Sequence, residues 1–237
     1  MRRLTVAIVR RLLFFVPGYV LSLLYFELRS TISRALSRPL ELDPSKQHYI
    51  NLGSGPFVVE GLTNIDFFDT EGIDYGADLR YPLKIQDQAV DGVFTEHAIE
   101  HLSYEEAGRL LADCHRILKP GGVVRIVVPD VSLFIRSYAD DDKYWFATWE
   151  QLMFIGSTDA ERAKRRLTAP IEAISFVTQE YGHRSSWDFA MLKGVLERIG
   201  FRNVKQTEFR RGQCDKLLVD LDEADRRFVS LYVEAVK

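Results

Sequence analysis

The stretch that decides the fold is Tyr49-Ile50-Asn51-Leu52-Gly53-Ser54-Gly55-Pro56, an apolar run that enters a glycine turn. A second apolar run, Leu62-Thr63-Asn64-Ile65-Asp66, ends in an acid thirteen residues after Gly53. A strand, a glycine turn, a second strand and a carboxylate, in this order, are how an open α/β sheet holds a nucleoside. The glycines let a ligand approach the backbone, and the acid accepts hydrogen bonds from the ribose hydroxyls. The sequence therefore predicts a nucleoside site on an α/β sheet.

Strands and helices alternate through the rest of the chain. Two segments have the form of capping boxes that open helices: Ser103 with Glu106, and Ser185-Ser186-Trp187-Asp188. The first helix is stopped at Lys119-Pro120-Gly121-Gly122 and the second at Gly200. The alternation predicts a doubly wound, mostly parallel α/β sheet. Its later strands are expected over 75–79, 89–95, 123–128, 204–209 and 230–236.

Residues 1–38 differ in charge from the rest of the chain. They hold seven arginines and one acid, Glu27, a balance of +6 in a chain whose net charge is −3. The remaining residues therefore carry −9, which argues against a nucleic-acid-binding main domain. We expect a basic, apolar helical segment over residues 1–42 and one domain over residues 43–237.

The apolar run over 12–26 is fifteen residues long and is interrupted by Pro17-Gly18. A helix that spans a bilayer needs about 20 apolar residues, so this run is short for a crossing. No small-residue cleavage site follows it, which argues against a signal peptide. Two interpretations remain, with a true spanning anchor as a less favoured third. Either the segment lies on an anionic membrane surface, or it packs on the main domain or forms a dimer contact.

The cysteine content favours a reducing compartment. Cys114 and Cys214 match no metal-ligand spacing and do not indicate a disulfide scaffold. We therefore expect a cytoplasmic protein, peripheral at the inner face of the membrane if residues 1–38 bind lipid. The sequence does not determine the oligomeric state.

Residues 130–184 interrupt the alternation with aromatic side chains and clusters of both charges. An insertion after the central strand lies over the carboxyl ends of the strands, where such sheets bind ligands. We expect a lid or substrate-binding cap here; the alternative is a helical elaboration that only covers the sheet. The aromatic residues are Tyr138, Trp145, Phe146, Trp149, Phe154 and Phe176.

Five motifs, in order, carry a resemblance to a known family. They are Asn51-Leu52-Gly53-Ser54-Gly55, Asn64-Ile65-Asp66, Ala77-Asp78-Leu79, Phe94-Thr95-Glu96-His97 and the run from Arg116 to Gly122. Together they resemble class I S-adenosylmethionine-dependent methyltransferases, and most closely the small bacterial type 11-like group, which is often associated with cell-surface polysaccharide or glycolipid pathways. The resemblance covers about residues 48–237. It implies a seven-stranded sheet, S-adenosyl-L-methionine as cofactor, and methyl transfer, which we expect to be O-methylation of a sugar or lipid-linked glycan.

The resemblance also implies roles for individual residues in cofactor binding. Backbone at Gly53, Ser54 and Gly55, with Asn51 before them, would meet the methionine part. Asp66 would hold the ribose hydroxyls, with Phe67 beside the adenine. Asp78 would accept from the adenine amino group and the Leu79 N–H would meet the ring, while Glu96 would lie at the methionine end.

The chain departs from the family pattern at the turn. Ser54 replaces a frequent cysteine, and Phe57 stands where a third glycine is usual. The path to Asp66 is too short for a full helix, so either the first helix is reduced to a turn or the strand boundaries lie elsewhere. The short path also counts against an NAD-dependent oxidoreductase, whose acid lies about 20 residues beyond the motif. A methyltransferase-like domain that binds a partner or membrane without catalysis remains the alternative function.

Two histidines are candidates for catalysis. His97 follows the fourth strand, and His183 precedes the second capped helix, where similar methyltransferases often have a histidine facing the acceptor. Either would serve as a base if the acceptor is a hydroxyl or a protonated amine. His97 and His101 are four residues apart, but the sequence shows no third ligand, so no metal site is predicted.

Overall fold

The computed structural model describes residues 18–67, 71–153, 155 and 167–237. The chain divides into two compact units, Met1–Arg38 and Pro39–Lys237. Helix α2 (Gly18–Leu36) is the described element of the first unit, and the start of the predicted apolar run lies outside the described residues. Within the described part of the chain, no helix combines the length and the apolar character that a membrane crossing requires.

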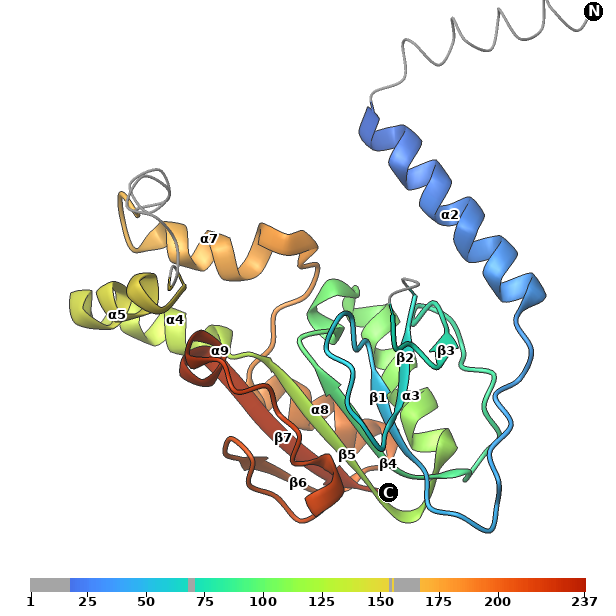
Figure 1. The fold of residues 1–237 in the computed structure, drawn as a ribbon. Coiled ribbons are helices and arrows are strands. Elements are labelled where there is room, and N and C mark those ends of the chain that lie inside the picture. The colour runs from blue at the N-terminus through green and yellow to red at the C-terminus, as the bar shows by residue number, and fades with distance from the viewer. Residues whose placement is uncertain (1–17, 68–70, 154, 156–166) are drawn as a thin grey trace, which may run out of the picture. The chain divides into compact units, whose positions relative to one another are not determined.

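The second unit is built on a seven-stranded sheet with the order β3-β2-β1-β4-β5-β7-β6 (Figure 1). Strands β1 to β5 pair in parallel, and β7 runs antiparallel to both of its neighbours. The predicted fold class, a mostly parallel seven-stranded sheet, is confirmed. The strands are β1 (Tyr49–Leu52), β2 (Thr63–Asp66), β3 (Tyr75–Gly76), β4 (Val90–Glu96), β5 (Leu118–Pro129), β6 (Arg202–Thr207) and β7 (Ser230–Val236).

The two faces of this sheet are covered differently. Helices α3 (Tyr104–Ile117) and α8 (Phe189–Ile199) pack on one face, where their apolar stripes join the main hydrophobic cluster. The other face carries a smaller cluster that includes Leu217 of the 3-10 helix η3 (Asp215–Leu217). Side chains of β5 alternate between the two: Ile126 belongs to the first cluster and Val127 to the second. This alternation is what a strand covered on both faces requires.

The connection between β1 and β2 contains no helix. Residues 53–62 form turns closed by Phe57 N–H donating to Ser54 O (2.9 Å) and Leu62 N–H donating to Val59 O (3.3 Å). Both strand boundaries lie within one residue of those expected from the sequence. Of the two explanations left open, the reduced first helix is therefore correct.

The two predicted helix starts have different outcomes. At α3, Ser103 and Glu106 form a complete capping box, as predicted. At α8 the cap is Asp188, whose carboxylate accepts from Met191 N–H (2.7 Å). The prediction of a capping box at Ser185 is wrong, because the Ser185 hydroxyl accepts a hydrogen bond from the Trp187 indole (2.9 Å).

Lys119-Pro120-Gly121-Gly122 also differs from its predicted role as a helix stop. Helix α3 ends at Ile117, and β5 begins at Leu118. The four residues therefore lie inside β5, where its pairing with β4 shifts register between Val90 and Gly92.

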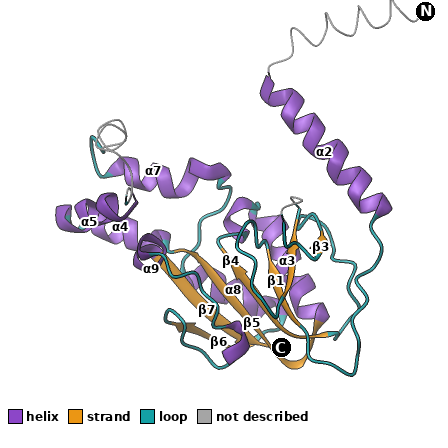
Figure 2. Cartoon of the chain, viewed as in Figure 1, coloured by secondary structure: helices purple, strands orange, loops and turns teal. Residues whose placement is uncertain are grey.

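Residues 130–184 form helices with a hydrophobic cluster of their own. Helices α4 (Val131–Ala139), α5 (Lys143–Met153) and α7 (Ile171–Gln179) follow the end of β5, with the 3-10 helix η2 (Glu180–Gly182) after them. Phe134 and Trp149 are buried in this cluster, to which α9 (Ala224–Val229) adds Val229. Figure 2 shows these helices together at the end of β5, beside the start of β7. Phe154 lies outside the described residues.

Candidate active site

Four adjacent parallel strands bring the predicted cofactor residues to one edge of the sheet. Gly53 follows β1, Asp66 ends β2, Asp78 follows β3 and Glu96 ends β4. The carboxyl ends of parallel strands meet at the same edge, which is where open α/β sheets bind ligands. The structure therefore gathers residues that lie more than forty positions apart in the sequence.

Gly53 lies close to Ala98, which follows the end of β4. Its φ is +69°, and a Cβ added to it would lie 2.5 Å from Ala98 Cβ and 3.4 Å from Leu79 Cδ1. Only glycine fits a left-handed residue with so close a neighbour. Ala98 belongs to the segment that joins β4 to the 3-10 helix η1 (Ile99–His101), so Gly53, Leu79 and the end of β4 meet at this point.

The rest of the turn is held by Asp66 and Asn51. Gly55 N–H donates to the Asp66 carboxylate (2.8 Å), which ties the turn to the end of β2. The buried Asn51 amide donates to Phe57 O (3.1 Å) and to Asn64 Oδ1 (3.0 Å), so it shapes the turn. The Ser54 hydroxyl is buried and has no hydrogen-bond partner among the described residues.

Asp78, the acid predicted to bind the adenine, forms an ion pair with Arg80. The guanidinium of Arg80 donates to both oxygens of Asp78, at 3.0 Å to Oδ1 and 2.7 Å to Oδ2. An adenine amino group bound at Asp78 would have to share that carboxylate with Arg80. Phe67 is half-buried and directly precedes the undescribed residues 68–70.

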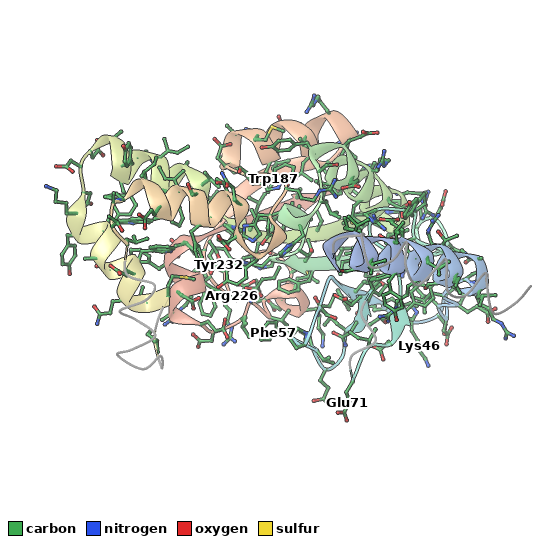
Figure 3. The ribbon with its side chains drawn as sticks, turned by 90° about the horizontal axis from the view of Figure 1, so that it is seen from above. Lys46, Phe57, Glu71, Trp187, Arg226 and Tyr232 are labelled. Carbon is green, nitrogen blue, oxygen red and sulfur yellow. The ribbon has the colours of Figure 1, made fainter. Side chains whose placement is uncertain are left out.

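Phe57 lies beneath a cation from the far end of the chain. The Arg226 guanidinium, on α9, is 5.0 Å from the centre of the Phe57 ring, a cation–π distance. Figure 3 shows the two side chains beside each other, although they come from the turn after β1 and from α9. Both line a cavity of about 520 Å³ together with Gly53, Ser54, Gly55, Glu96 and His97. The residue in place of the usual third glycine thus becomes part of a cavity wall.

Glu96 lies at the end of this cavity. Its Oε2 accepts from Leu221 N–H (3.0 Å), and Arg226 Nη1 lies 4.0 Å from Oε1. Burial raises the pKa of the Glu96 carboxyl.

A second cavity, of about 410 Å³, opens between the end of β4 and the inserted helices. It shares His97 and Arg226 with the first cavity, so the two are neighbours. Its wall combines histidines and acids from η1, from the segment after η2 and from the start of α9 with aromatic rings from α5, α7 and η2. They include Glu100, His101, His183, Trp149, Phe176, Tyr181, Glu223 and Asp225.

The His97 ring is hydrogen-bonded to Ser230 and lies close to Glu100. Its Nε2 lies 2.8 Å from Ser230 Oγ, and its Nδ1 lies 3.5 Å from Glu100 Oε1. Burial, helped by the Arg226 charge, lowers the pKa of His97 to about 3. Burial also raises the pKa of Glu100 to about 8. At neutral pH His97 is therefore an uncharged side chain that positions its neighbours.

The His183 ring is hydrogen-bonded to the backbone through one nitrogen, Nδ1. Its Nδ1 lies 2.7 Å from Val177 O, to which it donates, and its ring packs edge-to-face on His101 with centroids 4.9 Å apart. His101 therefore lines the same cavity as His183. Arg184, in contrast, pairs with Glu106 (2.6 Å) at the surface.

The sequence analysis missed Glu100 and Arg226. A signal for Glu100 was present, because Glu96-His97 and Glu100-His101 repeat the same pair four residues apart. Arg226 had no such signal, since it stands in a charged segment before β7 and reaches the site only through tertiary packing.

Comparison with known proteins supports the resemblance of the motifs. Residues 68–126 match the family model of a methyltransferase domain, and this match includes Asp78, Glu96 and His97. The chain carries a class I S-adenosylmethionine-dependent methyltransferase domain. Its cofactor is accordingly S-adenosylmethionine. No curated protein matches the methyltransferase in sequence.

Three solved methyltransferase structures resemble this chain at low sequence identity. A methyltransferase from Archaeoglobus fulgidus is 19% identical, with a TM-score of 0.48 over 93% of this chain and 100% of that one. An S-adenosylmethionine-dependent methyltransferase from Thermotoga maritima is 14% identical, with a TM-score of 0.47 over 90% and 89%. The didemethyltoxoflavin N1-methyltransferase of Burkholderia thailandensis, solved with its substrate and S-adenosylhomocysteine, is 13% identical, with a TM-score of 0.46 over 90% and 77%. At these scores no acceptor is carried over to this methyltransferase.

Proposed function

We propose that this methyltransferase O-methylates a sugar or a lipid-linked glycan bound in the cavity of about 410 Å³. One observation carries the proposal: His97, which lines this cavity, is followed by Ala98, which lies against Gly53 of the glycine turn. The cavity thus begins one residue from the turn that the family uses for the methionine end of its cofactor. A molecule in the cavity is a direct neighbour of that turn.

The residues at the sheet edge fit S-adenosylmethionine. Gly53 and Gly55 present backbone without a side chain, the buried Ser54 hydroxyl has no described partner, and Asp66 places a carboxylate at the end of β2. When bound, the cofactor supplies an electrophilic methyl group on a sulfonium. Alignment of the acceptor with that group carries much of such catalysis, because effective molarities for well-oriented partners are high. The role of the surrounding protein is therefore to position the acceptor against the methyl group.

The lining of the cavity suits a sugar. Tyr181 and Phe176 offer ring faces and edges, and the acids and histidines of the same lining offer hydrogen-bond acceptors for hydroxyl groups. Cavities that bind small molecules combine apolar walls with a few well-placed polar groups in this way.

His183 is the better placed of the two predicted catalytic histidines. Donation from Nδ1 to Val177 O leaves the lone pair on Nε2, which has no hydrogen bond to a described residue. That nitrogen is able to accept the proton of an acceptor hydroxyl. His97, bonded to Ser230 and facing Glu100, has the role of a positioning residue.

Residues 1–38 extend the proposal to the membrane. Their charge of +6 and their apolar run suit a peripheral contact with anionic lipid, which would bring the domain to lipid-linked acceptors.

The cofactor site is tested by calorimetry with S-adenosylmethionine. Wild type is expected to bind, and Asp66→Ala to bind at least 10-fold more weakly. Asp87→Ala, which removes an exposed carboxylate paired with Arg116, serves as the control and should bind like wild type. Equal binding by Asp66→Ala and wild type, or no binding by wild type, would contradict the site.

The acceptor is tested by labelling with methyl-tritiated S-adenosylmethionine in the presence of sugars, glycolipid extracts and amines. Label in a base-stable ether of a sugar supports the proposal, and it should fall strongly in His183→Gln. Label in an amine instead would overturn O-methylation. Cofactor binding without any methylated product would favour a non-catalytic binding domain.

A further inference from the structure

Three metal-binding side chains that the proposed methyl transfer does not require together converge at the wall of the acceptor cavity. Glu100 and His101 come from η1, and His183 comes from the segment after η2, more than eighty residues later. One carboxylate oxygen and one ring nitrogen of each histidine all lie within 4.8 Å of one another. We propose that Glu100, His101 and His183 bind one divalent transition-metal ion. This departs from the sequence-based expectation of no metal, which lacked a third ligand.

The strongest support is the state of the Glu100 side chain. It is 2% exposed, and neither of its oxygens has a hydrogen-bond partner among the described residues. A buried carboxylate without partners costs several kcal/mol in stability unless a proton or a cation neutralises it. His97 Nδ1 lies 3.5 Å from Glu100 Oε1 but forms no hydrogen bond with it. A cation between Glu100 and the two histidines satisfies this carboxylate.

The histidines show the geometry of ligands. Metal-binding histidines almost always donate one ring N–H to a carbonyl or carboxylate, which places the lone pair on the other nitrogen. His183 does this through Nδ1 and Val177 O at 2.7 Å. Its Nε2 therefore carries the lone pair, and the His101 ring lies edge-to-face against the His183 ring, with centroids 4.9 Å apart.

The distances leave only a small adjustment to make. Ligand atoms at about 2.0–2.2 Å from a tetrahedral ion lie about 3.4 Å apart, so the observed separations must shorten by up to about 1.4 Å. The His101 side chain is exposed, which leaves it room to change rotamer. The same exposure gives the ion a path from solvent, which a functional site requires.

The charge around the cluster favours a dication. Among the described residues that line the acceptor cavity, Glu100, Glu223 and Asp225 are acids and Arg226 is the arginine. The Arg226 charge is itself matched by Glu223, at 2.8 Å from Nε to Oε2. Two imidazoles with one carboxylate are ligands for zinc, iron, cobalt or nickel, whereas Mg²⁺ and Ca²⁺ prefer oxygen ligands alone. Three protein ligands also leave coordination positions open.

The function of the ion rests on the methyl transfer proposed above, but its binding does not. In the acceptor cavity an open position would take a hydroxyl oxygen of the acceptor, orient it and lower its pKa, with the proton passing to solvent. The ion would then replace His183 Nε2 as the partner of that oxygen.

The binding test uses tag-free, chelator-treated protein titrated with Co²⁺, without cofactor or acceptor. We expect one Co²⁺ per chain, visible as d–d absorption, and displacement by Zn²⁺ in calorimetry. Glu100→Gln and His183→Gln should each weaken binding by more than about 100-fold, because even outer-shell partners are worth about 10–100-fold. His48→Gln, which changes a histidine outside both cavities, should bind like wild type. Thermal unfolding of each variant checks that it is folded, and His101→Gln replaces any variant that is not.

The outcomes separate the metal from the methyl transfer. Absence of a Co²⁺ signal in wild type, or unchanged binding in Glu100→Gln and His183→Gln, would overturn the metal site. Methyl transfer that proceeds unchanged after chelation, with no bound ion, would overturn the role of the ion in the reaction and leave the proposed function standing. Co²⁺ bound by these residues in a protein that methylates no glycan would support the site and reject the function.

Discussion

Replacing Gly53 by alanine tests the close approach on which the site is built. Gly53 and Gly55 both have positive φ, +69° and +52°, so an alanine at either pays about 1–2 kcal/mol for the left-handed conformation. They differ in space. An added Cβ at Gly53 lies 2.5 Å from Ala98 Cβ, whereas at Gly55 it meets no described atom within 4 Å.

The extra cost at Gly53 follows from this overlap. Carbon atoms in contact are separated by about 3.5–4.0 Å, so either the turn or the end of β4 must move by about 1 Å. Overpacking of this kind costs about 1–3 kcal/mol. We therefore expect Gly53→Ala to lose about 2–5 kcal/mol in the free energy of unfolding and Gly55→Ala about 1–2 kcal/mol. The entropy that alanine removes from the unfolded chain is the same at both positions and cancels in the comparison.

Urea unfolding followed by circular dichroism measures these differences, and a double-mutant cycle assigns the cause. In Gly53→Ala with Ala98→Gly, the clashing methyl is gone, so about 1–3 kcal/mol of the loss should return relative to the two single variants. The same pair should recover affinity for S-adenosylmethionine, since a displacement of about 1 Å at such a site is costly. Equal losses in Gly53→Ala and Gly55→Ala, or no coupling with Ala98→Gly, would refute the reasoning.

Three further predictions concern the scaffold and the N-terminal segment. Arg125→Met should cost about 3–5 kcal/mol in unfolding experiments, because it leaves Asp220 and Glu234 as unpaired buried charges. Lys119→Met is the control: it breaks a half-exposed pair with Asp91 and should cost about 0–1 kcal/mol. A similar loss in both variants would show that burial of the Arg125 pair has no special weight. Ser103→Ala removes the hydroxyl half of the α3 capping box and should cost about 1 kcal/mol by the same assay, and no measurable loss would contradict the cap. Deletion of residues 1–38 should abolish sedimentation with anionic vesicles and leave binding to neutral vesicles unchanged, and identical sedimentation of truncated and full-length protein would reject the membrane contact.

Much of the fold is visible in the sequence because its signals are local. The apolar run before Gly53, the acid thirteen residues later and the capping box at Ser103 each depend on neighbours within a few positions. The short path from Gly53 to Asp66 left two explanations, a reduced first helix or different strand boundaries, and the structure shows the first. Errors arose where a local signal competed with tertiary contacts, as at Ser185, whose hydroxyl bonds to Trp187 and leaves the cap to Asp188.

The sequence by itself determined the order of strands and helices, and its motifs indicated the class of cofactor. It also determined the residues at the carboxyl ends of β1 to β4, because parallel strands align those ends whatever the rest of the chain does. Only the tertiary structure decided what faces that edge. It brings Arg226 over Phe57, sets Ala98 against Gly53 and joins His183 to Glu100 and His101. These contacts link positions that are distant in sequence, and no periodicity or spacing encodes such pairs. They follow from how the inserted helices and α9 pack against the sheet, which depends on the whole core at once.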